Sequence, residues 1–206
     1  ITSGGNYNVV VGDEAGTALT TGDQNVAVGY QALDALDTAI RNVAIGTTAL
    51  TSDTKGDASV AVGHSALYAQ NFTTTTSAYN VAVGYHAGVN VTTGLRNTII
   101  GGLAGDATTD ADDNIALGYN SLGANTVGSR SVAVGTDALA TQNPATATDM
   151  YNTAVGYDAG QEITTGQNNT FLGGRSGLST TTGGNNTALG KDSMYSTTVG
   201  LYNVAV

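Results

Sequence analysis

The sequence Asn25-Val26-Ala27-Val28-Gly29 recurs along the whole chain and decides the fold. Its other copies begin at Asn8, Asn42, Ser59, Asn80, Asn97, Asn114, Ser131, Asn152, Asn169, Asn186 and Asn203. Successive starts lie 17 residues apart, except at two steps of 21 residues. A fixed period of this length is the signature of a protein built from stacked repeats.

A longer unit of 72 residues contains four of these repeats. It divides the chain into segments 8–79, 80–151 and an incomplete 152–206. In the first two units the 21-residue copy carries the same pair, Gln70-Asn71 and Gln142-Asn143. Residues 1–206 are therefore interpreted as one repeat array, built by duplication of a four-repeat block, and we expect it to be a segment of a longer fibre.

The repeated phrase is short, β-branched and bounded by Gly, which predicts a strand. Side chains alternate between the two faces of a strand, so Val26 and Val28 share one face and Ala27 points to the other. The small residue at the third position suggests that another backbone approaches closely. The Gly predicts a sharp corner. The phrase that follows, such as Tyr30–Leu33, is expected to form a second extended segment.

Seventeen residues cannot bury a core of their own, so each repeat must stack on the next. The expected fold is an all-β, parallel β-roll or β-solenoid of about 12 rungs, roughly 50–60 Å tall. Helices are disfavoured by the content of Gly and Thr. Because so small a coil has little interior, several chains are expected to pack side by side and bury their Ala-rich or Val-rich faces.

The composition excludes several classes of protein. Six Lys and Arg residues against 16 Asp and Glu residues give a net charge of −10, which argues against a nucleic-acid partner. The chain has no Cys, so it has neither disulfides nor thiolate metal sites. No apolar run approaches the length of a membrane span, and no membrane insertion or cofactor is expected for this segment.

The stretch Asn152–Gly160, which reads Asn-Thr-Ala-Val-Gly-Tyr-Asp-Ala-Gly, is similar to repeat arrays of phage and bacterial tail-fibre-like proteins. The phrase also resembles the head repeats of trimeric autotransporter adhesins of the YadA type, whose repeat is shorter, near fourteen residues. The resemblance covers essentially the whole chain. It implies a left-handed β-roll, three chains in each fibre and a role in attachment at a cell surface.

Few residues suggest chemistry. Asp110, Asp112 and Asp113 gather oxygen ligands that could hold Ca²⁺, although they occur in one repeat. His64 and His86 lie one repeat apart and could meet, but two exposed His residues are more often incidental. Adjacent carboxylates point to opposite faces of a strand and do not converge as a glycosidase pair requires. No catalytic residues are assigned, and the chain is predicted not to be an enzyme.

Recognition is assigned to two groups of residues. The first lies in the least regular stretches, 68–78 and 140–150, which are expected to be exposed loops; it comprises Tyr68, Gln70, Asn71, Phe72, Gln142, Asn143 and Pro144. The second comprises Tyr30, Tyr85, Tyr119 and Tyr157, each placed directly after a corner Gly. Tyr can bind sugars or protein through its flat face and hydroxyl group. The alternative is that these rings cover the neighbouring rung.

The sequence thus favours a structural and adhesive fibre segment at a cell surface or on a virion, which binds copies of itself and a glycan or protein receptor. Three alternatives stay open. One is an ice-binding solenoid, which would need Thr at one strand position on consecutive rungs. The others are a polysaccharide-degrading, tailspike-like protein and a subunit of an end-to-end extracellular filament.

Overall fold

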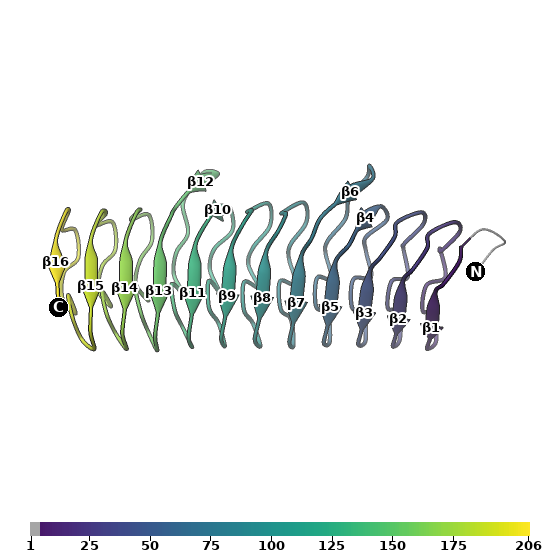
Figure 1. Ribbon diagram of the computed structural model, residues 1–206, viewed down its shortest axis with the longest axis horizontal. Helices are drawn as coiled ribbons and strands as arrows, with labels where there is room; N and C mark the ends of the chain where they lie inside the picture. Colours follow the sequence, from purple (N-terminus) through teal and green to yellow (C-terminus); the bar gives the residue numbers. More distant parts are fainter. Residues whose placement is uncertain (1–4) are drawn as a thin grey trace.

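The computed structural model describes residues 5–206 and forms one β-solenoid. Twelve strands form a single parallel sheet, one strand from each copy of the repeat (Figure 1). They are β1 (Val9–Val11), β2 (Val26–Val28), β3 (Val43–Ile45), β5 (Val60–Val62), β7 (Val81–Val83), β8 (Thr98–Ile100), β9 (Ile115–Leu117), β11 (Val132–Val134), β13 (Thr153–Val155), β14 (Thr170–Leu172), β15 (Thr187–Leu189) and β16 (Val204–Ala205). No helix occurs in this range. The predicted all-β, parallel solenoid is confirmed.

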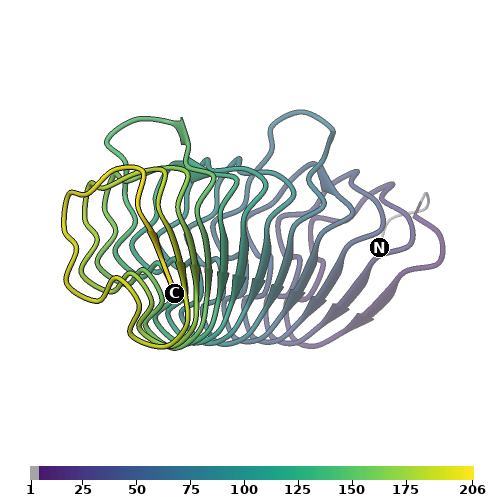
Figure 2. The ribbon, with the colours of Figure 1, turned by 60° about the vertical axis from the view of Figure 1, so that its left-hand side comes forward.

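The strands pair in perfect repeat register. Val28, Ile45 and Val62 are direct partners in β2, β3 and β5, so equivalent residues form columns along the rod. Backbone hydrogen bonds link each rung to the next, as from Val26 N to Asn42 O at 2.8 Å. Turned by 60°, the rungs are seen as closed coils that follow one another along the rod (Figure 2). Each rung therefore depends on its neighbours for its backbone hydrogen bonds.

The third strand position faces the interior of the coil. Ala27, Ala44 and Ala61 are almost completely inaccessible to solvent within the single chain. They belong to the same buried cluster as Leu33 and Leu50 from the phrase after the corner. The expectation that another chain covers the Ala-rich face is therefore wrong, because the opposite wall of the same coil already covers it.

In the interior of the coil, a large residue on one wall faces a small residue on the other. Five of the eleven complete rungs combine Ala in the strand with Leu after the corner, as in Ala133 and Leu139. Where the strand carries Phe171, the residues after the corner on its own and the preceding rung are Gly177 and Gly160. A Cβ at Gly177 would lie 2.5 Å from the Phe171 ring, and one at Gly160 would lie 2.8 Å from it. The Phe171 ring thus occupies the space that these two Gly residues leave in the narrow core.

The phrase after the corner is not a strand, contrary to expectation. Alternate residues adopt left-handed backbone angles, for example Gln31 and Leu33, both at φ 53°. These angles curl the chain into successive turns. The turns still stack between rungs, as shown by the 3.1 Å hydrogen bond from Leu33 N to Ala49 O. The wall opposite the sheet is therefore made of stacked turns rather than of a second sheet.

The corner Gly is required by both conformation and space. Gly29 has φ 135°, a backbone angle that other residues rarely adopt. A Cβ at Gly29 would also lie 2.5 Å from the carbonyl oxygen of Gly46 in the next rung. The predicted sharp corner is confirmed.

The Asn residues that begin ten of the twelve strand phrases form a ladder along the rod. Asn25 Oδ1 accepts a hydrogen bond from Asn42 N at 2.9 Å, and Asn25 Nδ2 donates to Ala39 O at 2.9 Å. Each side chain thus holds two parts of the next rung boundary in place: the start of the next strand, and the end of the turn that leads into that strand. Such pairing is needed because unpaired buried amides are costly.

The two 21-residue rungs extend one edge of the rod. In each, the insertion adds a short parallel pair, β4 (Gly56–Asp57) with β6 (Thr76–Ser77), and β10 (Gly128–Ser129) with β12 (Thr148–Asp149). The segments that carry β6 and β12 rise above the outline of the regular rungs (Figures 1 and 2). We call this side of the molecule the insertion edge.

Candidate interaction surface

The outward face of the long sheet is mainly apolar. The second and fourth strand positions point away from the buried Ala column, and they carry mainly Val, Ile and Leu. Ile45, Ile100, Leu172 and Leu189 are among its exposed residues. Because the strands are in register, these side chains form two continuous columns. We call this surface the strand face.

Thr interrupts the strand face at one end. Thr153, Thr170 and Thr187 are direct partners on β13, β14 and β15. Thr98 on β8 stands between Val81 and Ile115. The Thr column that ice binding would need therefore extends over three consecutive strands, and apolar residues dominate the rest of the face.

The insertions display only some of the residues assigned to recognition. Tyr68, Asn71 and Asn143 are exposed. Residues 73–75 and 145–147 are exposed as well, and they form the tips of the insertions.

Four of the assigned residues are buried, and their assignment to a receptor-facing surface is corrected. They are Gln70, Phe72, Gln142 and Pro144. The two Gln side chains replace the missing Asn of the ladder, because the strand phrases of these rungs begin with Ser. Gln70 Nε2 donates to Ser59 Oγ at 3.1 Å, and Asn80 Nδ2 donates to Gln70 Oε1 at 2.8 Å.

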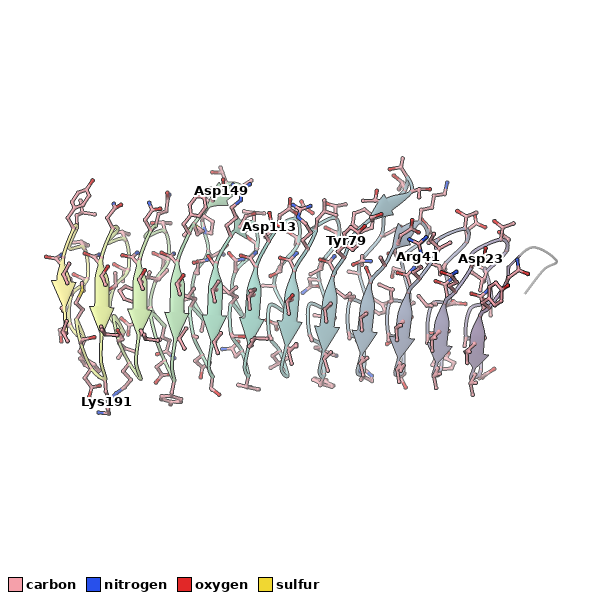
Figure 3. The ribbon with its side chains drawn as sticks, in the orientation of Figure 1. Asp23, Arg41, Tyr79, Asp113, Asp149 and Lys191 are labelled. Carbon is pink, nitrogen blue, oxygen red and sulfur yellow. The ribbon has the colours of Figure 1, made fainter. Side chains whose placement is uncertain are left out.

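Tyr30, Tyr85, Tyr119 and Tyr157 are exposed at the corners after the strands. Backbone hydrogen bonds hold these corners in register, as from Asp137 N to Tyr119 O at 3.0 Å. Lys191 occupies the same repeat position and is labelled at the lower edge in Figure 3, whereas Tyr79 is labelled at the upper, insertion edge. We call the lower side the corner edge. The aromatic rings thus lie on the opposite side of the rod from the insertions.

Polar side chains accompany the Tyr residues along the corner edge. Asn120 Nδ2 donates to Asp137 Oδ1 at 2.6 Å, from one rung to the next. The negative charge of Asp158 raises the pKa of the neighbouring Tyr157 hydroxyl. Burial raises the pKa of Asp158 itself. The sequence interpretation overlooked these polar residues, although their constant place, two residues after the corner Gly, would have revealed them.

His64, Tyr85 and His86 form one aromatic cluster at this edge. The ring centroids of Tyr85 and His86 are 4.0 Å apart, and those of His64 and His86 are 5.5 Å apart. The expected approach of the two His residues is therefore found. Their rings stack on each other, and His64 Nδ1 lies 3.0 Å from Ser65 Oγ.

The acidic residues proposed for Ca²⁺ are dispersed among different partners on the preceding rung. Asp110 accepts from the hydroxyl groups of Thr92 and Thr93 at 2.5 and 2.8 Å. Asp112 Oδ1 accepts from Leu95 N at 2.8 Å.

Asp113 forms an ion pair with Arg96 at 2.6 Å. The hydrogen bond from Arg96 lowers the pKa of the Asp113 carboxyl. Among residues 5–206 no group of three potential ligands forms a metal site, so the suggested Ca²⁺ site is corrected.

No protein-family model, curated protein or solved structure matches the chain. Residues 5–206 contain no helix that is long and apolar enough to cross a membrane.

Proposed function

We propose that the chain is a non-enzymatic structural and adhesive fibre segment, in which copies of the chain associate side by side along the strand face. The resemblance to tail-fibre and adhesin repeats favours three chains and a place at a cell surface or on a virion. The proposed fibre carries recognition residues on the edges that this association leaves free.

The observation that carries the proposal is the continuous apolar strand face. Contiguous exposed apolar surface on this scale marks an interaction site. The partner surface must be equally long and regular to cover all twelve strands, and a second copy of the chain has that regularity. Since the Ala column is already covered within the coil, the strand face is the surface that gains most from association.

The arrangement of the acidic residues favours a structural role over hydrolysis. The Asp112 carboxylate orders the backbone of the preceding rung, and Asp113 pairs with Arg96. A carboxyl whose pKa is lowered by an Arg is poorly suited to act as a general acid. These charges instead tie neighbouring rungs together.

The proposal is tested by sedimentation of the wild-type chain and of the variant Val83→Asp. Val83 lies near the middle of the strand face on β7. We expect a stable oligomer for the wild type and a folded monomer for the variant, because the introduced charge would be buried in the interface. Thr74→Asp, on the exposed tip of the first insertion, is the matched control and should leave the oligomer intact.

Circular dichroism of each sample establishes that the coil itself is folded. A wild-type chain that stays monomeric at micromolar concentration would contradict the proposal. So would an oligomer that Val83→Asp leaves unchanged.

A further inference from the structure

Three of the four Tyr residues of the corner edge follow a two-rung period. Tyr85, Tyr119 and Tyr157 occupy every second rung of the same column. The rungs between them carry Gly102 and Thr136 at this position. Because strands of a sheet are about 4.8 Å apart, successive rings repeat about every 10 Å along the rod. That repeat is close to the length of one disaccharide unit in an extended β-1,4-linked glycan.

The small residues between the rings leave the rings accessible. A Cβ at Gly102 would lie 3.7 Å from Cδ2 of Tyr119, so the Tyr119 ring extends over the Gly of the preceding rung. The three Tyr side chains are 57%, 55% and 60% exposed. The ring of His86 stacks on one face of Tyr85, with the ring centroids 4.0 Å apart. The result is a row of separate aromatic platforms rather than a continuous apolar strip.

Hydrogen-bonding groups run beside these platforms. Asn120 and Asp137 are partly exposed and lie on neighbouring rungs, each one residue after the column of the rings, whereas the equivalent Asp158 is buried. Planar amide and carboxylate groups can bond the hydroxyl groups of a sugar whose apolar face stacks on a ring. An edge that offers both kinds of contact at a constant spacing suits a repeating, amphipathic ligand.

The charge of the edge selects among glycans. Asp137 is a partly exposed acidic residue here, and the whole chain has a net charge of −10. Uronic or sialic acid polymers would be repelled by this surface. A neutral glycan meets no such penalty.

From these observations we propose that the corner edge between Tyr85 and Tyr157 binds an extended, neutral β-1,4-linked glycan. The inference rests on the proposed fibre function and specifies its receptor class. One glycan chain lies along the rod axis, with successive disaccharide units stacked on Tyr85, Tyr119 and Tyr157. Asn120 and Asp137, which are partly exposed, bond its hydroxyl groups. Four rungs, about 19 Å, separate the outer rings, so an oligosaccharide must be several sugars long to use all three.

The experiment measures binding of two neutral hexasaccharides by calorimetry, one of β-1,4-linked glucose and one of β-1,4-linked N-acetylglucosamine. The wild-type chain is compared with Tyr119→Ala and with the control Tyr79→Ala. Tyr79 is 58% exposed but lies at the insertion edge (Figure 3). We expect Tyr119→Ala to weaken binding about tenfold and Tyr79→Ala to leave it unchanged. The disaccharides should bind much more weakly than the hexasaccharides.

Binding to one or both hexasaccharides with this pattern supports the inference and identifies the sugar. Three results would overturn it: no binding of either hexasaccharide, equal loss in both Tyr variants, or stronger binding of an oligogalacturonate of the same length. Sedimentation of the same samples reports the oligomeric state independently. A chain that assembles but binds no neutral glycan would refute this inference and leave the proposed fibre function standing.

Discussion

The two 21-residue rungs, residues 59–79 and 131–151, share a backbone path, but the buried residue that each meets on the preceding rung is charged in one case and neutral in the other. In both, a Ser begins the strand phrase and a Gln completes the Asn ladder. The first Gln meets Asp53, and the second meets Asn125 at the equivalent position. Asp53 and Asn125 are both inaccessible to solvent. The duplicated unit thus contains a natural comparison of a carboxylate and an amide in the same pocket.

The carboxylate gathers more donors than the amide does. Asp53 accepts from Gln70 Nε2 at 2.5 Å, from Gly56 N at 2.9 Å and from Phe72 N at 3.1 Å. Asn125 accepts from Gly128 N at 3.2 Å and donates to Gly128 O at 2.8 Å. Its bond from Gln142 is 3.3 Å long. The comparison teaches that the fold tolerates a buried charge where the insertion supplies donors from its own backbone and side chains.

The largest effect is expected from the apolar residue that closes each pocket. Phe72 packs over Gly56, where a Cβ would lie 2.8 Å from its ring, and Pro144 packs over Gly128 at 3.1 Å. Phe72→Ala should lower the free energy of unfolding by about 3–5 kcal/mol, because it leaves a cavity above a buried carboxylate. Pro144→Ala removes fewer atoms and should cost about 1–2 kcal/mol. Urea unfolding of the two variants measures the difference, and equal costs would contradict it.

The next effect separates the two Gln residues. Gln70→Ala removes a donor from a buried carboxylate and should cost about 3 kcal/mol at neutral pH, since unpaired buried charges are penalised most. Gln142→Ala removes a longer bond to a neutral amide and should cost about 1–2 kcal/mol. Hydrogen exchange of the amides at Gly56 and Gly128 reports each pocket separately. A larger loss of protection at Gly128 in Gln142→Ala than at Gly56 in Gln70→Ala would reverse the interpretation.

The sequence predicts these regions unevenly. The period and the Val-x-Val alternation predict the strands and their register, because a one-residue slip would expose the whole Ala column. They do not predict which face is internal, since a small Ala suits both a tight coil and a tight contact between chains. The turns after the corner were also missed, because residues such as Leu33 adopt left-handed angles that they rarely take alone.

The role of Gln70 and Gln142 was within reach of the sequence. Ser59 and Ser131 are the two copies of the phrase that lack Asn, and each is followed by Gln eleven residues later. Because this Gln appears in both rungs that lack the Asn, the sequence indicates that the Gln amide takes the place of the missing Asn amide. The pair was instead interpreted as exposed because the stretches around it are irregular, and exposure cannot be inferred from irregularity alone. No comparable feature of the sequence predicts that Asp53 is buried, since the equivalent position of the next 72-residue unit is Asn125.

The smallest and most specific effect is expected from exchange of the two side chains. Burial raises the pKa of the Asp53 carboxyl in the folded chain, and the hydrogen bonds from Gln70, Phe72 and Gly56 offset part of that rise. A group whose pKa is higher in the folded state contributes its full stability below its unfolded pKa of about 3.9. That contribution is lost as the pH rises through the folded pKa. Asp53→Asn should therefore raise the free energy of unfolding at pH 7.

The advantage of Asp53→Asn over the wild type should shrink as the pH falls from 7 toward 4, because acid protonates the wild-type carboxyl. Asn125→Asp should show the opposite sign, with a loss at pH 7 that acid reverses. The stability that Asn125→Asp loses at pH 7 should exceed the stability that Asp53→Asn gains. The reason is that the pocket around residue 125 has no donor equivalent to Phe72 N. Unfolding midpoints of the three chains across this pH range measure these differences, in which the other carboxylates cancel. A difference between wild type and Asp53→Asn that does not change with pH would show that the Asp53 pocket stabilises the charge as well as water does.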